Sequence, residues 1–339
     1  MALRRDRLLE LLAGAAECRI AVVGDVMLDR YLLGDTDRLS PEAPVPVVNV
    51  TQTRATLGGA ANVASNVRAM GAECALVGVI GDDPSGASIR IELAGQGLSD
   101  ARLLEVAGRP TTSKTRLVSR GQQIVRIDEE VERFLTGDDL ARFEQMALDA
   151  LSESDGLLLQ DYNKGALPPP LIRTLIEAAR KSGVPVVADP KFRQFFDYAG
   201  ATVFKPNRRE LEAALGARVD LGHREALPDA ITQLNVDNLL LTLGGDGMIL
   251  VTQDKEVTHI PSLTRGVSDV SGAGDTVTAW VGTMLAAGAT IQEAAAVANY
   301  AANVEVTKPG VATVSVEEVL GVYDTRHDQI GRWRRGGVI

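Results

Sequence analysis

The sequence predicts an α/β protein with a doubly wound, mainly parallel sheet, helices on both faces and a small β lid beside it. Short apolar runs rich in valine, isoleucine and leucine alternate with longer segments of helical composition. That is the element order of a parallel sheet whose strands are joined by helices. The first run, residues 19–27 (RIAVVGDVM), is continuously apolar before its polar end, which is typical of a strand buried on both faces.

The remaining elements follow in order along the chain, after an amphipathic helix that precedes residue 19. Prolines and acidic residues at the starts of several segments mark helix N-termini, and glycines mark their ends. The charged segment from residue 324 onward is expected to be a mobile tail. Strands are expected at 74–80, 156–160, 184–189, 238–242 and 248–252, and helices at 84–94, 137–151, from the triple proline 168–170, and at 290–306.

Two stretches interrupt this alternation and are expected to form the lid. Residues 31–56 include SPEAPVP, whose prolines exclude a helix, followed by valines of extended character. Residues 112–128 alternate apolar and polar side chains. We expect the two stretches to pair as a small sheet over the binding crevice, where they would exclude water from a reactive phosphate. Alternatively, both are ordinary edge strands.

The segment 269–276 (DVSGAGDT), followed by an apolar run, predicts an anion site at the start of a helix. Gly272, Ala273 and Gly274 carry almost no side chain, so their amides can converge on one anion beside the positive end of the helix dipole. Asp275 repels such an anion unless it has a chemical task. That task would be to take a proton from a hydroxyl that attacks the anion. The alternative is that Asp275 only caps the helix.

A second group of small residues suits a ligand rich in hydroxyl groups. Gly58 and Gly59 permit close approach of a ligand to the backbone, and Asn62 lies in the first turn of the helix that follows. Asp29 follows the first strand, where a carboxylate can bind hydroxyl groups. Glycines that only serve packing and an aspartate in a solvated turn are the alternatives.

Polar residues after the later strands predict a second part of the same crevice. Asp161 with Lys164, Asp189 with Lys191, and Lys205 would converge at one edge of the sheet. Asn207 and Glu210 have the spacing of a capping box, and the functional alternative is contact with Mg²⁺-bound water and phosphate. The turn at Gly244, Gly245, Asp246 and Gly247 fits a hairpin, and it also leaves backbone room for a nucleotide.

Composition excludes several other classes of protein. The formal net charge of −10 over 339 residues, without a basic run interleaved with aromatic residues, argues against nucleic-acid binding. The two cysteines, Cys18 and Cys74, lack metal-ligand spacing, and the three histidines are scattered. No stretch is long and apolar enough for a membrane span, so we expect a cytoplasmic protein. A nicotinamide dehydrogenase is disfavoured because the first strand is not followed by G-x-G-x-x-G.

Together these motifs resemble the ribokinase-like (PfkB) carbohydrate kinases over nearly the whole chain. The resemblance rests on GGAAN at 58–62 and GAGD at 272–275, with NRRE at 207–210 and TLGG at 242–245 between them. The segments GDVMLDRY (24–31), SPEAPVPV (40–47), DYNKGA (161–166) and DPK (189–191) resemble, within that family, the kinases of D-glycero-β-D-manno-heptose 7-phosphate. The alternatives are a kinase for another sugar or sugar phosphate and a noncatalytic sugar-sensing protein of the same fold.

The resemblance implies transfer of the γ-phosphoryl group of ATP, with Mg²⁺, to the anomeric hydroxyl of heptose 7-phosphate. It also implies a homodimer through the lid, and it leaves room for a monovalent cation near Asp269. One kinase domain spanning residues 1–339 is expected, without a nucleotidyltransferase domain. By the same resemblance, Asp275 would be the base, and the transferring phosphoryl group would be bound by Gly272, Ala273 and Gly274. The sugar would be bound by Asp29, Gly58, Gly59 and Asn62, and its phosphate by Arg116, Arg126, Lys164 and Lys191. Mg²⁺ would be held through water by Asn207 and Glu210, and the nucleotide would be bound by Asn207, Glu210, Thr242, Gly244, Gly245, Gly247 and Asn299.

Overall fold

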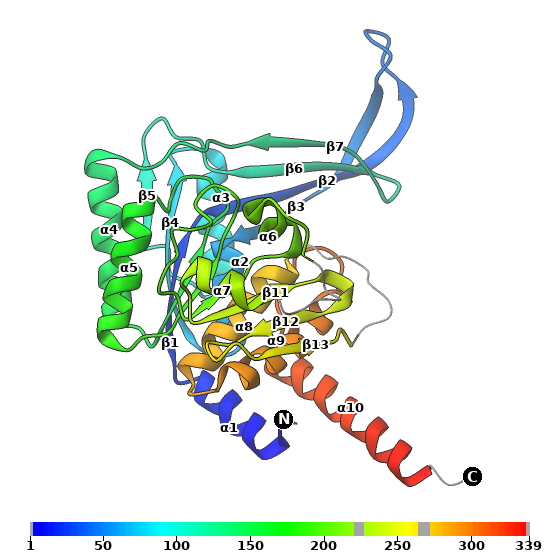
Figure 1. Ribbon diagram of the computed structural model, residues 1–339. Coiled ribbons are helices and arrows are strands. Elements are labelled where there is room, and N and C mark those ends of the chain that lie inside the picture. Colours follow the sequence, from blue (N-terminus) through cyan, green and yellow to red (C-terminus); the bar gives the residue numbers. More distant parts are fainter. Residues whose placement is uncertain (1–2, 220–226, 264–271, 337–339) are drawn as a thin grey trace.

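The strands form two sheets in the computed structural model, which describes residues 3–219, 227–263 and 272–336 (Figure 1). The larger sheet has nine strands in the order β13-β12-β11-β10-β9-β8-β1-β4-β5. Neighbours from β11 to β5 are parallel, and β12 and β13 complete one edge as antiparallel hairpins. Its strands are β1 (Arg19–Gly24), β4 (Glu73–Gly81), β5 (Leu103–Val106), β8 (Gly156–Gln160), β9 (Val186–Asp189), β10 (Val203–Phe204), β11 (Asn238–Thr242), β12 (Met248–Val251) and β13 (Val257–Ile260).

Helices cover both faces of this sheet, as predicted. Along β1, Ile20 and Val22 join one hydrophobic cluster and Ala21 and Val23 the other, because successive side chains of a strand point to opposite faces. No helix in the described ranges combines the length and apolar character needed to cross a membrane. One face is covered by α1 (Arg5–Ala15), α2 (Ala60–Ala69), α3 (Pro84–Gly95), α8 (Ala273–Ala286), α9 (Ile291–Glu305) and α10 (Val316–Gly336), and the other by α4 (Gly137–Ser152), α5 (Pro169–Ser182), α6 (Arg208–Leu215) and α7 (Leu227–Leu234).

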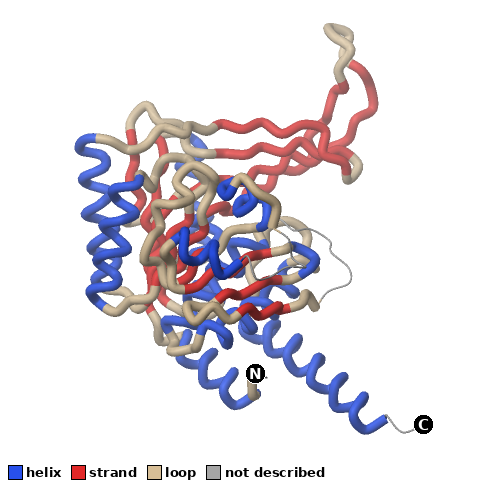
Figure 2. The backbone as a smooth tube through the Cα atoms, in the orientation of Figure 1, coloured by secondary structure: helices blue, strands red, loops and turns tan. Residues whose placement is uncertain are grey.

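The two interrupting stretches pair into a separate sheet, which confirms the predicted β lid. Its order is β3-β2-β6-β7, and the long β2–β3 hairpin projects well beyond the body of the molecule (Figures 1 and 2). Every residue of β7 is exposed. The strands are β2 (Val26–Leu39), β3 (Pro46–Gly59), β6 (Ser113–Ser119) and β7 (Gln122–Glu129).

Two predicted boundaries are wrong. The first strand ends at Gly24, and the following residues start the lid strand β2, because the chain turns at Asp25. The carboxylate of Asp25 accepts hydrogen bonds from the backbone amides of Tyr162, Lys164 and Ala166, which fixes this turn against the neighbouring loop. The segment from residue 324 onward, for which no helix was expected, continues α10 as far as Gly336.

Candidate active site

Asp275 lies buried in the first turn of α8 and is surrounded by hydrogen-bond donors. Its Oδ2 accepts from the Asn62 amide at 2.8 Å, and its Oδ1 accepts from the Gln160 amide at 3.0 Å and from the Tyr162 hydroxyl at 2.8 Å. The N-cap residue of α8 is Gly272. The carboxylate is therefore held by side chains from three other segments, and the interpretation of Asp275 as the helix cap is wrong.

The surroundings of Asp275 tune its basicity. Burial raises its pKa to about 6 and the nearby Asp189 carboxylate adds to this rise, although hydrogen bonds from Asn62 and Tyr162 and the charge of Lys205 oppose it. A carboxylate with this pKa is mostly ionised at neutral pH and is more basic than an ordinary aspartate. These are the properties of a general base that works near pH 7.

A buried network connects Asp275 to a cation beside the start of α8. The Gln160 amide also donates to Asp189 Oδ2 at 2.9 Å, and the same oxygen lies 3.1 Å from Lys205 Nζ. A Cβ built on Gly274 would lie 3.6 Å from this ammonium. Lys205 is 3 % exposed, so its charge is weakly screened by solvent at the predicted anion site.

The turn before α8 has the predicted small-residue geometry. Gly272 has φ +94°, and a Cβ there would lie 3.1 Å from Glu305 Oε1 and 3.3 Å from Asn62 Nδ2, so a larger residue would be strained and crowded. The amides of the first helical turn have no acceptor within the helix and can bind an anion. The predicted cation site near Asp269 lies outside the described residues.

The predicted sugar-binding residues meet where the lid joins the body. Asp29 lies within β2, and not at the end of a sheet strand as expected, because the first strand had already ended at Gly24. A Cβ on Gly58 would lie 2.5 Å from Asp29 Oδ2. Gly59 has φ +58°, and its Cβ would lie 2.3 Å from the Asp25 carbonyl oxygen. A side chain at Gly59 would thus meet backbone, whereas one at Gly58 would displace the side chains of Asp29 and Met27.

The four predicted cations for the sugar phosphate are all engaged with carboxylates. The Arg116 guanidinium also lies 5.3 Å from the Tyr31 ring centroid, and the Lys191 ammonium lies 4.8 Å from that of Tyr162. Lys191 therefore lies beside the tyrosine that donates to Asp275, and Arg116 lies beside Asp29. The ion pairs are Arg116–Asp29 (2.5 Å), Arg126–Asp128 (2.8 Å), Lys164–Glu130 (2.7 Å) and Lys191–Glu210 (2.5 Å).

Asn207 and Glu210 form the predicted capping box of α6. The Glu210 amide donates to Asn207 Oδ1 at 2.9 Å, and the Asn207 amide donates to Glu210 Oε2 at 2.8 Å. No group of three histidine, cysteine, aspartate or glutamate residues gathers as a metal cage in the described parts of the chain. This donor set fits Mg²⁺ only as an ion that keeps most of its waters and is held largely by substrate phosphates.

The glycine turn after β11 joins it to the antiparallel strand β12, so the predicted hairpin is confirmed. Gly247 has φ +89°, and its Cβ would lie 2.2 Å from the Ile260 carbonyl oxygen. At Gly244 and Gly245, in contrast, a Cβ would meet no described atom within 4 Å, which leaves open space beside Thr242. Asn299 on α9 donates to the Pro261 carbonyl at 3.0 Å and so holds the segment after β13.

The sequence motifs assign no catalytic or binding role to Gln160, Tyr162 or Lys205, although all three reach the centre of the site. Gln160 ends a buried apolar strand, and a polar residue at that position was an available signal. Lys205 directly follows β10 and was noted only as a polar strand end. The hydroxyl of Tyr162 could not be placed because the loop that carries it is fixed by the buried Asp25.

The chain matches known proteins in sequence and in fold. The family model of the pfkB family carbohydrate kinases matches residues 18–318. The chain belongs to this family. It is therefore a sugar kinase. A curated relative, "Bifunctional protein HldE" of Shewanella piezotolerans, is 41 % identical over 319 residues, which are 93 % of this chain and 65 % of the relative. The protein of the same name from Pseudomonas syringae is 46 % identical over 304 residues, 88 % of this chain and 62 % of that one.

Solved structures share the fold of this kinase. Ribokinase of Arabidopsis thaliana, complexed with ribose and ATP, has a TM-score of 0.72 at 22 % identity, covering 90 % of this chain and 98 % of that one. Phosphofructokinase-2 of Escherichia coli, in complex with potassium, has a TM-score of 0.73 at 17 % identity, and the match covers 91 % of this chain and 98 % of that one. At these identities the likeness extends to the fold, and the ribokinase-like architecture is confirmed.

Proposed function

We propose that this kinase transfers the γ-phosphoryl group of ATP to the anomeric hydroxyl of D-glycero-β-D-manno-heptose 7-phosphate, giving the 1,7-bisphosphate, in the cytoplasm. The observation that carries the proposal is the buried Asp275 carboxylate, with its pKa of about 6, in the first turn of α8. A base beside an anion-binding helix start is the arrangement that transfer to a hydroxyl requires.

In the proposed reaction, Asp275 takes the proton of the acceptor hydroxyl as its oxygen attacks the γ-phosphorus. The bond between that phosphorus and the bridging oxygen breaks, and ADP leaves with the electron pair. The amides of Gly272, Ala273 and Gly274 and the ammonium of Lys205 hold the transferring group, whose equatorial oxygens carry negative charge. The amide of Asn62 holds the carboxylate of Asp275 in position as the acceptor hydroxyl reacts.

The nucleotide is proposed to lie along the hairpin turn after β11 and the start of α6. Thr242, Gly244, Gly245 and Gly247 would lie against it, and Asn299 would support that side from α9. Asn207 and Glu210 would order the waters of Mg²⁺, which when bound neutralises charge on the nucleotide phosphates. A monovalent cation near Asp269 remains part of this proposal.

Heptose 7-phosphate is favoured as the acceptor by two observations. The relatives named HldE point to heptose metabolism, although the matched region is only about two thirds of their length. The segments DYNKGA and SPEAPVPV resemble kinases of this sugar. Asp29, Gly58, Gly59 and Asn62 would bind its hydroxyl groups. The candidate cations for its phosphate are Arg116, Arg126, Lys164 and Lys191. Each would have to release its carboxylate partner in order to bind the phosphate.

We also propose a homodimer formed through the lid sheet. The exposed strand β7 carries Ile124, Val125 and Ile127, which are 42 %, 44 % and 53 % exposed, and Val50 of β3 is 48 % exposed. Exposed apolar side chains on both edge strands of a projecting sheet favour a covered interface. A second lid is the partner that would cover them with matching chemistry.

The proposed function is tested by ADP formation with purified protein, ATP and Mg²⁺ against a panel of acceptors. The panel contains heptose 7-phosphate, the unphosphorylated heptose, ribose and fructose 1-phosphate. We expect heptose 7-phosphate to give the highest kcat/KM by at least about tenfold, since a site shaped for one sugar leaves its polar groups unpaired with another. A higher kcat/KM for ribose or fructose 1-phosphate would replace heptose 7-phosphate as the acceptor.

A further inference from the structure

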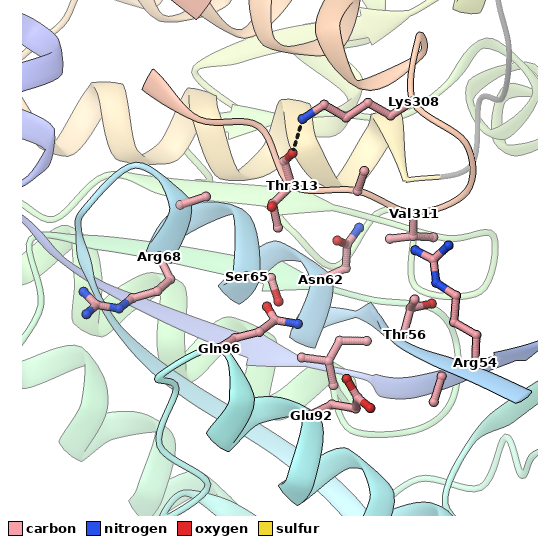
Figure 3. Close-up of a pocket in the computed structure, with 14 residues that line it drawn as sticks. Arg54, Thr56, Asn62, Ser65, Arg68, Glu92, Gln96, Lys308, Val311 and Thr313 are labelled. Atoms are coloured by element: carbon pink, nitrogen blue, oxygen red, sulfur yellow. Dashed lines mark hydrogen bonds between the residues drawn. The ribbon is translucent and has the colours of Figure 1, made fainter. Parts of the chain in front are cut away.

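A cavity of about 640 Å³ opens beside the base, between the lid strand β3, the helices α2 and α3, and the segment 308–313 (Figure 3). Asn62, whose amide holds Asp275, is part of its wall. The wall of the cavity therefore includes the residue that fixes the base. The Lys308 ammonium forms an ion pair with Glu318 at 2.6 Å and donates a hydrogen bond to the Thr313 carbonyl at 2.7 Å. These contacts fix the wall opposite α2.

The lid strand β3, which carries Gly58 and Gly59 of the proposed sugar site, also forms one wall of the cavity. In the antiparallel register of β2 and β3, Met27 faces Gly58, Asp29 faces Thr56 and Tyr31 faces Arg54. Residues that face one another in this way, and every second residue along a strand, project from the same face of a sheet. Arg54 and Thr56 therefore share the face that carries Asp29. Both line the cavity, together with Ala55 and Leu57 from the opposite face of β3.

Arg54 and Arg68 are the cavity's two arginines, and neither forms an ion pair within residues 3–219, 227–263 and 272–336. They differ in position. Arg54 lies at the end of the cavity that holds Thr56 and Val311, whereas Arg68 lies at the opposite end, with Asn62 and Ser65 between them (Figure 3). The four lysine and arginine residues predicted for the sugar phosphate, in contrast, already have carboxylate partners.

We propose that the Arg54 end of this cavity is the subsite for a phosphate monoester on the acceptor sugar, with Arg54 as the residue that determines this specificity. The inference rests on the proposed sugar-kinase reaction at Asp275. A sugar whose reacting hydroxyl lies at the base has its other end directed past Asn62, where a guanidinium is free to bind two phosphate oxygens. Glu92 and Gln96, on the α3 wall, offer acceptors for the hydroxyl groups between the two ends.

The test compares kcat/KM for heptose 7-phosphate and for the same heptose without its phosphate. Arg54→Gln is expected to lower kcat/KM for the phosphorylated sugar by about 10- to 100-fold, the scale of one charge-assisted contact, and to change that for the neutral sugar by less than about twofold. Arg54→Lys, which keeps the charge but loses the two-pronged contact, should lie between wild type and Arg54→Gln. Arg68→Gln, with the same loss of charge at the far end, is the matched control and should affect neither sugar by more than about twofold.

Equal losses for both sugars, or no loss for either, would overturn the inference while leaving the proposed function intact. If the wild type instead prefers another sugar phosphate, the proposed acceptor is wrong, and the same comparison on that acceptor and its dephosphorylated form still decides the role of Arg54. A wild type that shows no preference for any phosphorylated acceptor overturns the inference. Thermal unfolding of each variant confirms that the protein remains folded.

Discussion

Replacing Asp275 by asparagine removes the proposed base with almost no change in shape. The carboxylate accepts three hydrogen bonds, from Asn62, Gln160 and Tyr162. An asparagine has one acceptor oxygen, so at least one of the two amide donors loses its partner, at a cost of about 1–3 kcal/mol in stability. This cost is offset in part because a buried negative charge beside Asp189 is removed. We therefore expect the variant to fold with a modest change in Tm.

The catalytic effect of this substitution should be much larger than its effect on stability. Loss of a general base lowers kcat by about 10²- to 10⁴-fold, while ATP binding should be little weakened because a charge that repels phosphate has gone. The measurements are kcat from ADP release with heptose 7-phosphate and an ATP titration of the same protein. A kcat within about threefold of the wild type would refute the assignment of Asp275 as the base.

Three further perturbations follow from the structure. Tyr162→Phe removes a hydrogen bond that lowers the pKa of Asp275. The acid limb of the pH profile of kcat/KM, where the base becomes protonated, should therefore move from about pH 6 to higher pH by up to about one unit. An acid limb at the wild-type pH would contradict this. Gly59→Ala places a Cβ 2.3 Å from the Asp25 carbonyl oxygen at a φ of +58°. The free energy of unfolding, measured in urea, should fall by about 2 kcal/mol or more. A free energy of unfolding equal to that of the wild type would mean that the junction between lid and body adjusts freely. Ile127→Glu should convert the proposed lid dimer to monomer in sedimentation at micromolar concentration, and a monomeric wild type would remove the dimer.

Much of the fold was predictable because its signals are local. The continuous apolar run of β1 and the alternation of strands and helices predicted the buried parallel sheet. Likewise, the spacing of Asn207 and Glu210 predicted the capping box, and Asp246-Gly247 predicted the hairpin. Each of these depends on residues within one element or one turn.

The centre of the site was only partly predictable because it depends on contacts between distant segments. Asn62 and Asp275 are 213 positions apart, and Gln160 at the end of β8 reaches both Asp189 and Asp275. Asp29 was misplaced because the turn at Asp25 transfers the chain from one sheet to the other. The face of the lid to which a side chain belongs also depends on strand register, which spacing alone does not determine.

The most direct test of the sugar-phosphate kinase assignment is ³¹P NMR of the reaction with ATP, Mg²⁺ and heptose 7-phosphate. We expect one ADP per sugar consumed and a second phosphate-ester resonance coupled to the anomeric proton, beside the unchanged 7-phosphate signal. Asp275→Asn should give neither product signal in the same time. ADP formed without a new sugar ester, or an ester at another hydroxyl, would contradict the proposed transfer to the anomeric hydroxyl.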